Sequence, residues 1–377
     1  MRTPLAWFNS IEQPRRTAAA VGGMCFALLL IFMQAGFLGA ARMNVSIIFQ
    51  ALDFDIAIHS RAYLTLPRSD PFDRLRLAQA ASVPGVGRVT RFLTDTFGWR
   101  NARTGATASG FMLAVPADSG AFLDPRINAQ LHTIRPTLTA LVDRKCRPSY
   151  GAWQVGDKCI LNSQPAVITG EYELGLGLLA DGSVIVSDDT FERLQGPQNS
   201  RFANLGLVKV AAGADVAQVA GALRQHLPND VVVVPRAEII RREQNYFINV
   251  KPVGVLFQVG MIVAFAAGAA ILYQILASEM NNRLSEFATL KALGYPSSSI
   301  YAIGIQQGLI YALLAYGPAL LLAAILYRVA RQLSGFPLYM DAGRAGFVFL
   351  LALAMCAFAA LLSLWKIRRA DPADLFR

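Results

Sequence analysis

Four long stretches of the chain contain no charged residue. They cover residues 17–41, 253–278, 296–327 and 345–365. An α-helix rises about 1.5 Å per residue, so about 20 apolar residues cross a hydrocarbon layer about 30 Å thick. Each stretch is long enough to do this, and a buried helix in a soluble core is usually shorter. The pattern therefore predicts four transmembrane helices.

The first stretch has a second interpretation. It follows Arg15 and Arg16 and ends in small residues, which is also typical of a cleaved secretory signal peptide. The apolar core of a signal peptide is usually about 7–15 residues long, and this stretch is much longer. We therefore expect a retained membrane anchor.

Between the first two stretches, the pattern changes to one of short strands and helices. Strands are predicted at 54–58, 89–93, 111–115, 158–161, 166–170, 183–187, 205–210 and 231–234, with 138–142 ambiguous. Helices are predicted at 71–81, 188–194 and 215–226, and a polar helical stalk at 236–250. Ser187 or Asp188 is available to cap the second helix. The region predicts an α+β domain large enough for its own core.

The fold class is therefore a membrane protein with four transmembrane α-helices and one large domain between the first and second spans. The predicted segments are an amphipathic N-terminal tail at 1–16, spans at 17–41, 253–276, 300–327 and 345–365, the domain with its stalk helices at 42–252, loops at 277–299 and 328–344, and a C-terminal tail at 366–377. The tail has Leu5, Phe8 and Ile11 on one face and Trp7 beside them, so we expect it to lie on a membrane surface.

Positive charge beside the spans predicts the orientation. The 377 residues carry a formal net charge of +10. The two tails and the loop 277–299 hold nine Lys and Arg residues, whereas the loop 328–344 holds three. Cytoplasmic loops carry the excess of Lys and Arg, so both termini should be cytoplasmic and the large domain outside. These charges would meet anionic lipid headgroups, and they form no stripe for nucleic-acid binding.

The four cysteines divide between the spans and the large domain. Cys25 and Cys356 lie in spans, where we expect them to pack. Cys146 and Cys159 lie in the outer domain, where an oxidising compartment permits a disulfide, although two free thiols are the alternative. The spacing lacks the companion His or Cys pair of a zinc site, so no metal is expected.

Small residues form one face of the second span. Gly260, Ala264 and Gly268 recur every four positions, which favours close packing against another helix of this chain or of a second copy. The polar residues of the spans are mainly glutamines. Glutamines in spans more often hydrogen-bond between helices than form a substrate path.

Sequence motifs for catalysis are absent. There is no Gly-x-x-x-x-Gly-Lys-(Ser/Thr) loop, so we do not expect this chain to bind ATP. There is also no Gly-x-Ser-x-Gly and no His-Glu-x-x-His motif. The three histidines, His59, His132 and His226, are scattered through the large domain. The chain is predicted not to be an enzyme and to need no cofactor.

The most informative segment lies between the second and third spans. Residues 285–296 predict a short helix that stops at Gly294. Its apolar side chains, Phe287, Leu290 and Leu293, share one side. Such a helix needs a surface on which to dock. The membrane, the protein's own helices and a partner subunit are equally compatible with the pattern.

This segment resembles the Glu-x-x-x-Leu-(Arg/Lys)-Ala-(Leu/Ile)-Gly signature of FtsX/MacB-type permeases, in which the helix couples the spans to a separate ATPase. The matching residues are Glu286, Leu290, Lys291, Ala292, Leu293 and Gly294. Further stretches resemble DevC-type permeases of this family, at 172–175, 180–182, 185–188, 227–231, 273–276 and 370–376. The resemblance implies that the matching residues and Phe287 contact the ATPase.

The chain departs from the DevC-type pattern at residues 176–178, where it has Leu-Gly-Leu. The resemblance implies a partner-binding loop that contains Glu173, Gly175, Asp181 and Gly182. The alternative is that Glu173 and Gly175 only shape a turn.

By this resemblance, the chain is the dimeric permease subunit of an ABC exporter in a bacterial inner membrane, with a MacB-like periplasmic domain. It would work with a cytoplasmic ATPase, a periplasmic adaptor and an outer-membrane channel, and transmit motion to expel a lipid, glycolipid or other hydrophobic cargo. Two alternatives remain open. They are an FtsX-like transducer that regulates a cell-wall hydrolase, and a lipoprotein-releasing permease.

Overall fold

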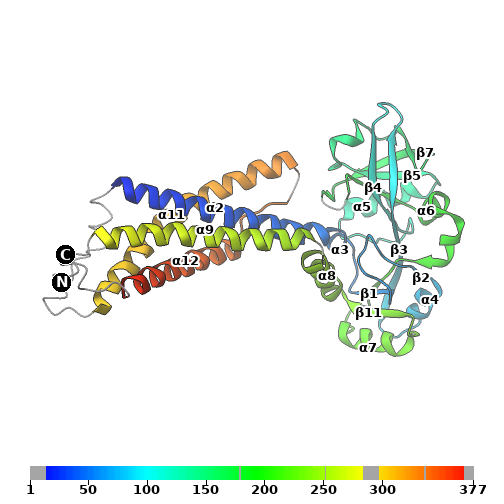
Figure 1. The fold of residues 1–377 in the computed structure, drawn as a ribbon. Helices are drawn as coiled ribbons and strands as arrows, with labels where there is room; N and C mark the ends of the chain where they lie inside the picture. The colour runs from blue at the N-terminus through cyan, green and yellow to red at the C-terminus, as the bar shows by residue number, and fades with distance from the viewer. Residues whose placement is uncertain (1–13, 178–179, 251, 283–296, 335–336, 369–377) are drawn as a thin grey trace. The chain divides into compact units, whose positions relative to one another are not determined.

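The computed structural model describes residues 14–177, 180–250, 252–282, 297–334 and 337–368 (Figure 1). It divides into two compact units. One consists of residues 1–40, 253–333 and 338–377, and is called the membrane unit here. The other consists of residues 41–252 and 334–337, and is called the α+β domain.

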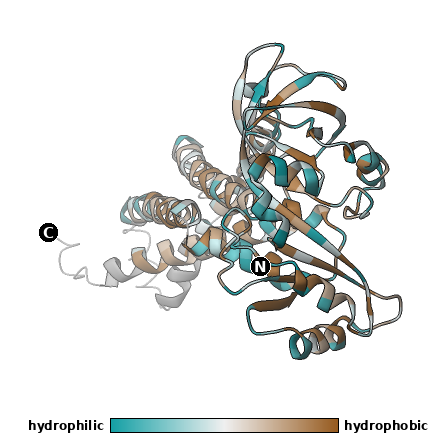
Figure 2. Cartoon of the chain, turned by 90° about the vertical axis from the view of Figure 1, so that its right-hand side faces the viewer, coloured by the Kyte–Doolittle hydropathy of each residue, from teal (hydrophilic) through white to brown (hydrophobic). Residues whose placement is uncertain are grey.

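Four long helices form the membrane unit, which confirms the four predicted membrane helices. They are α2 (Pro14–Val45), α9 (Pro252–Asn282), α11 (Ser297–Ser334) and α12 (Ala342–Arg368). The segments long and apolar enough to cross a membrane are Thr17–Val45, Gly254–Glu279, Ile305–Gln332 and Ala342–Ser363. Apolar positions, brown in Figure 2, are frequent along these helices.

The core of the membrane unit is rich in alanine. Buried alanines include Ala264, Ala269, Ala312, Ala315, Ala319, Ala352 and Ala359. Small side chains let helix backbones approach closely, which favours packing where lipid gives no hydrophobic driving force between helices. Larger side chains such as Phe32 and Tyr311 fill the remaining space.

The α+β domain is built on one nine-stranded sheet in the order β11-β1-β10-β3-β4-β8-β5-β7-β6. The strands are β1 (Ile56–Ser60), β3 (Val86–Asn101), β4 (Thr107–Ala114), β5 (Thr139–Asp143), β6 (Lys158–Leu161), β7 (Gln164–Tyr172), β8 (Ser183–Val186), β10 (Leu205–Val210) and β11 (Val231–Pro235). A separate pair is formed by β2 (Phe72–Asp73) and β9 (Phe202–Ala203).

Part of this sheet closes on itself. β6 also pairs with β3, so six strands from β3 to β6 form a ring. Alternate residues of these strands, such as Phe97, Met112, Val142, Ile168 and Val184, belong to one buried cluster. Because side chains alternate between the two faces of a strand, this cluster fills the inside of the ring.

Short helices connect the strands. They are α3 (Ile47–Ala51), α4 (Leu75–Ala81), α5 (Pro125–Gln130), η1 (Leu131–Ile134), η2 (Pro148–Tyr150), α6 (Asp188–Gln195), η3 (Pro197–Arg201), α7 (Val216–His226), α8 (Arg236–Asn245) and η4 (Tyr246–Val250), the last a π-helical turn. The Ser187 side chain caps α6 by accepting a hydrogen bond from the Thr190 N–H, as predicted. Asp215 caps α7 in the same way.

The structure differs from the prediction at several boundaries. The helix expected at 71–81 begins only at Leu75, because Phe72 and Asp73 pair with β9 as a strand. The strand expected at 89–93 extends over 86–101, since β3 pairs first with β10 and then with β4. The second half of β3 has no clear strand pattern in its own sequence. It forms a strand because β4 pairs with it.

Candidate functional site

The predicted coupling residues Glu286, Phe287, Leu290, Lys291, Leu293 and Gly294 lie outside the described residues. Leu178, in the departure from the DevC-type pattern, also lies outside them. The described chain reaches Asn282 at the end of α9 and resumes at Ser297, where α11 begins.

The predicted partner loop runs from the end of β7 to the start of β8, and a buried carboxylate holds its first part. Asp143, at the end of β5, is fully buried. Its Oδ1 accepts a hydrogen bond from the Leu174 N–H at 3.0 Å, and its Oδ2 accepts one from the Gly175 N–H at 2.6 Å. No sequence pattern identifies Asp143. Its hydrogen bonds nevertheless fix the first part of the predicted partner loop.

The same carboxylate joins a hydroxyl network. The Ser183 hydroxyl donates to Asp143 Oδ2 at 3.3 Å, and the Tyr172 hydroxyl donates to Ser183 Oγ at 2.7 Å. Burial, and then the nearby charge of Asp143, raise the pKa of Tyr172 well above its usual value. Tyr172 therefore stays protonated and remains a donor.

Two ion pairs lie on the exposed side of this loop. Lys145 Nζ lies 3.2 Å from Glu173 Oε2, and Arg147 Nη1 lies 3.0 Å from Asp181 Oδ1. Arg147 also donates through Nη2 to the Gly177 carbonyl at 2.7 Å. Exposed pairs contribute little stability, about 0–1 kcal/mol each, so they can exchange for charges on a partner at small cost.

Both predicted glycines of the loop are structurally required. Gly175 has φ +77°, in the left-handed region that glycine adopts without strain. A Cβ at Gly182 would collide with Cys146 Sγ and the Tyr150 ring. The interpretation that glycine shapes the turn is thus compatible with a binding role for its charged neighbours.

A cavity of about 480 Å³ lies beside this loop. Its lining includes Arg144, Arg147, Trp153 and Glu171. Arg144 Nη1 lies 3.1 Å from Glu171 Oε1, so the cavity carries paired charges next to an indole ring. Such a surface suits a polar protein segment.

Cys146 and Cys159 are both free thiols in the structure, so the predicted disulfide is not formed. Cys146 follows β5 and Cys159 lies on β6, with β7 between these strands. Cys159 belongs to the buried cluster inside the ring, and Cys146 packs against that cluster. Burial raises the pKa of both thiols to about 12, which keeps them protonated.

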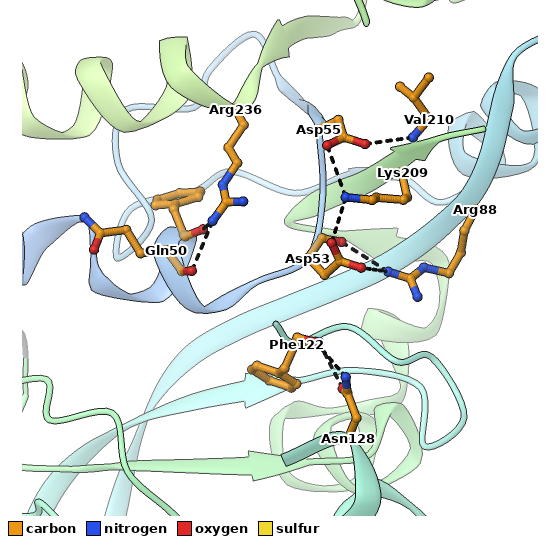
Figure 3. Close-up of polar contacts among 10 residues, drawn as sticks. Gln50, Asp53, Asp55, Arg88, Phe122, Asn128, Lys209, Val210 and Arg236 are labelled. Carbon is orange, nitrogen blue, oxygen red and sulfur yellow. Dashed lines mark hydrogen bonds and ion pairs between the residues drawn. The ribbon is translucent and has the colours of Figure 1, made fainter. Parts of the chain in front are cut away.

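The segments that connect the α+β domain to the first two spans are bonded to each other. Arg236, the first residue of α8, donates through Nη2 to the carbonyls of Phe49 at 3.1 Å and Gln50 at 3.0 Å, in the last turn of α3 (Figure 3). Further along α8, the Gln244 side chain donates to Ser46 Oγ at 3.2 Å. α8 and α3 are therefore clamped together.

A charge cluster ties the chain that leaves α3 to the sheet. Lys209 Nζ lies 2.9 Å from Asp53 Oδ1 and 3.2 Å from Asp55 Oδ1, and Arg88 Nη2 lies 3.0 Å from Asp53 Oδ2 (Figure 3). Burial acts to raise the pKa of Asp53, but the hydrogen bonds and charges of Lys209 and Arg88 outweigh it and lower that pKa.

α8 also carries a buried acid. Glu243 Oε1 accepts hydrogen bonds from the Tyr63 hydroxyl at 2.5 Å and from the Leu66 N–H at 3.0 Å. Burial raises the pKa of Glu243 to about 7, although both hydrogen bonds act to lower it. Glu243 therefore attaches the segment that follows β1 to α8. No sequence pattern indicates this contact.

The small-residue face of the second span packs inside the membrane unit. A Cβ at Gly260 would meet Gln34 of α2, and one at Gly268 would meet Ala27 of α2 and Met355 of α12. Ala264, between them, is buried. Gly260, Ala264 and Gly268 therefore lie against helices of the same chain.

No group of three or more His, Cys, Asp and Glu residues that could hold a metal ion is found among the described residues. The described residues contain a helix bundle, two connecting segments that are hydrogen-bonded to each other, and a loop with exposed ion pairs.

The fold defines a multi-pass membrane protein with a large α+β domain. Residues 259–372 match the family model described as "FtsX-like permease C-terminal". The C-terminal part of the chain is therefore similar to FtsX-like permeases, and the matched range includes the predicted coupling segment. No curated protein matches the chain.

Two solved structures are similar to the α+β part of the chain. The extracellular domain of the noncanonic ABC-type transporter YknZ from Gram-positive bacteria is 10% identical, with a TM-score of 0.35, and the match covers 48% of this chain and 98% of that one. The periplasmic region of MacB from Actinobacillus actinomycetemcomitans is 10% identical, with a TM-score of 0.37, and the match covers 52% and 96%.

Proposed function

We propose that this chain is the permease subunit of an ABC exporter of the DevC type. It transmits ATP-driven motion of a separate ATPase subunit to the α+β domain. The observation that carries the proposal is the FtsX-like match over residues 259–372, which contains the segment with the Glu286 to Gly294 signature. The chain itself hydrolyses no ATP in this proposal.

In this proposal the coupling segment is the part of the chain that contacts the ATPase. Glu286 and Lys291 offer charges to the ATPase, while Phe287, Leu290 and Leu293 offer an apolar face. Because the segment follows α9 directly, a displacement at the ATPase is passed to the second span. From there it reaches η4 and α8, which precede α9 in the chain.

The clamp between α8 and α3 is the output end. Arg236 and Gln244 join the chain that enters the second span to the chain that leaves the first. A displacement of either connecting segment is then shared by both. The charge cluster at Asp53 passes it on to the sheet.

On the far side of the membrane we place the adaptor at the loop with Glu173, Gly175, Asp181 and Gly182. Its exposed ion pairs can be replaced by pairs with a partner. The assembly would be a homodimer in a bacterial inner membrane, with both termini cytoplasmic, the α+β domain periplasmic and an outer-membrane channel beyond the adaptor. A lipid, glycolipid or other hydrophobic molecule is the proposed cargo.

Co-expression with the cognate ATPase tests the input end. The wild-type chain should copurify with the ATPase, whereas Glu286→Arg and Leu290→Arg should lose most of it, since each places a large cation in the proposed contact. Asn281→Arg, an exposed position at the end of α9, is the matched control and should copurify normally. Undiminished copurification of both loop variants would refute the assignment.

A further inference from the structure

A buried carboxylate lies in the membrane unit. Glu279 is the last residue of the second candidate span, and only 9% of its surface is exposed. An acidic side chain at membrane depth is costly, and where one occurs it usually has a specific partner and a function. Glu279 follows directly after the uncharged stretch 253–278, and no sequence motif includes it.

Glu279 is bonded to the next helix in the chain. The Tyr311 hydroxyl on α11 donates to Glu279 Oε2 at 3.1 Å. The same hydroxyl accepts a hydrogen bond from Gln307 Nε2 at 3.0 Å. Tyr311 and Gln307 are 1% and 5% exposed, so the three polar side chains form a buried chain between α9 and α11.

The positions of Glu279 and Tyr311 in the sequence indicate what this hydrogen bond does. Glu279 lies three residues before α9 ends at Asn282, and Tyr311 lies on α11, which begins at Ser297. All of residues 283–296 therefore lie between the two bonded helices. The hydrogen bond joins the helices that precede and follow the coupling segment.

We propose that the Glu279–Tyr311 hydrogen bond is a positioning clasp for the coupling segment, with Gln307 orienting the Tyr311 hydroxyl. The clasp rests on the function proposed above. A docked segment passes a displacement to the spans only if the helices on its two sides move together. Without the clasp, relative motion of α9 and α11 would absorb that displacement.

A hydrogen-bonded clasp also explains the residue types. Phenylalanine at position 311 would leave the Glu279 carboxylate without this donor, and the cost of such a loss is high away from water. Gln307 lies one helical turn before Tyr311, where residues four apart face each other. Its amide donates to the Tyr311 hydroxyl, and the same hydroxyl donates to Glu279.

Hydrogen exchange measured by mass spectrometry on the full chain in lipid nanodiscs tests the clasp. Tyr311→Phe should raise the exchange rate of amides in 283–296 by about three- to tenfold, the factor that corresponds to about 0.6–1.4 kcal/mol for an interhelical hydrogen bond. Glu279→Leu should do the same. Glu279→Gln keeps an acceptor oxygen and should stay close to the wild type.

Tyr316→Phe is the matched control. It lies on the same helix, and its hydroxyl donates to the Ala345 carbonyl of α12 at 2.8 Å. It should leave exchange in 283–296 unchanged, and its melting temperature should be close to that of Tyr311→Phe. In a chain that already carries Glu279→Leu, Tyr311→Phe should cause little further rise in the exchange rate of residues 283–296.

Three results would overturn the clasp. They are unchanged exchange in 283–296 in Tyr311→Phe, an equal rise in Tyr316→Phe, or complete absence of protection in this segment in the wild type. The measurement contains no ATPase. Its outcome is therefore separate from the copurification experiment, and loss of ATPase binding by the wild-type chain would sink the proposed function without changing the exchange result.

Discussion

Asp143 and Glu243 are both buried carboxylates, but they hold their surroundings in different ways. Asp143 receives hydrogen bonds from the Lys145, Leu174 and Gly175 amides, on both of its oxygens, at the base of the partner loop. Glu243 has only two described donors, on one oxygen, and burial raises its pKa to about 7. The first residue fixes the start of the loop proposed to bind a partner, and the second makes the stability of a connecting segment sensitive to pH.

Asp143→Asn should lower the free energy of unfolding of the α+β domain by about 2–4 kcal/mol. An amide nitrogen would replace an oxygen that accepts from buried donors, which leaves those donors unpaired. Urea unfolding of the full chain in detergent, followed by the fluorescence of Trp99 and Trp153 with the other two tryptophans replaced, measures this. Glu173→Gln breaks only an exposed ion pair and should cost less than about 1 kcal/mol. Equal losses in the two variants would contradict the role of Asp143.

Glu243 should make the same unfolding free energy fall as pH rises. Its folded pKa of about 7 lies above its ordinary 4.5, so its contribution is full below about pH 4.5 and is lost as pH passes through about 7. The full effect is at most about 3 kcal/mol. Neighbouring His59 acts oppositely, because burial lowers its pKa, and this favours the folded state as pH rises towards its ordinary 6.5.

The difference between wild type and Glu243→Gln isolates the Glu243 effect from that of His59. The stability lost between pH 5 and pH 8 should be smaller in Glu243→Gln, since the amide keeps an acceptor for Tyr63 and Leu66 and does not titrate. Glu173→Gln, at an exposed position far from α8 in the sequence, should keep the wild-type profile. If Glu243→Gln and the wild type give parallel profiles, the carboxyl is not the titrating group.

At the scale of elements, α8 connects the second span to the sheet, and its contacts with α3 make it more than a linker. The last carbonyls of a helix have no hydrogen-bond donor within that helix. Arg236 provides a donor for two such carbonyls at the end of α3. Its guanidinium also lies 5.3 Å from the centre of the Phe54 ring. One side chain therefore holds the end of α3, the strand entry and α8 together.

Arg236→Met should loosen this junction while keeping most of the apolar stem. We expect amide exchange in residues 47–52 to rise about fivefold or more, which corresponds to the loss of about 1–2 kcal/mol from two hydrogen bonds to a charged group. Arg241→Met, at an exposed position of the same helix, should leave this exchange unchanged. A rise of equal size in both variants would show that charge on α8, rather than the clamp, stabilises α3.

Elements with local signals were predictable from the sequence. The membrane helices follow from the absence of charge, and strands such as β6 and β10 follow from their apolar residues and flanking turns. Phe72 and Asp73 were wrongly assigned to a helix because only pairing with β9 makes them a strand. At the site, Glu173 and Gly175 were identified by resemblance. Asp143, Arg236 and Glu279 were missed, because a single charged residue carries no local sign of the tertiary contacts that bury or bond it.

At the scale of the whole molecule, the proposal needs the coupling segment and the partner loop on opposite sides of one membrane. Four spans place the loop between the second and third helices on the side of both termini, and the α+β domain on the other side. The distribution of Lys and Arg predicts that the first side faces the cytoplasm. In the proposed transmission, displacement of the coupling segment reaches the α+β domain through α9 and α8, and the contacts between α8 and α3 share it with the end of the first span.

Labelling of single cysteines in intact cells decides this arrangement. In a chain whose four cysteines are replaced, Lys158→Cys in the α+β domain should react with a membrane-impermeant maleimide once the outer membrane is permeabilised. Lys291→Cys should react only after the inner membrane is also opened, because the cytoplasmic side is then exposed. Asn281→Cys, an exposed site that ends α9, should follow Lys291→Cys. Reaction of positions 158 and 291 under the same condition would place input and output on one side, and no displacement could then pass through the membrane between them.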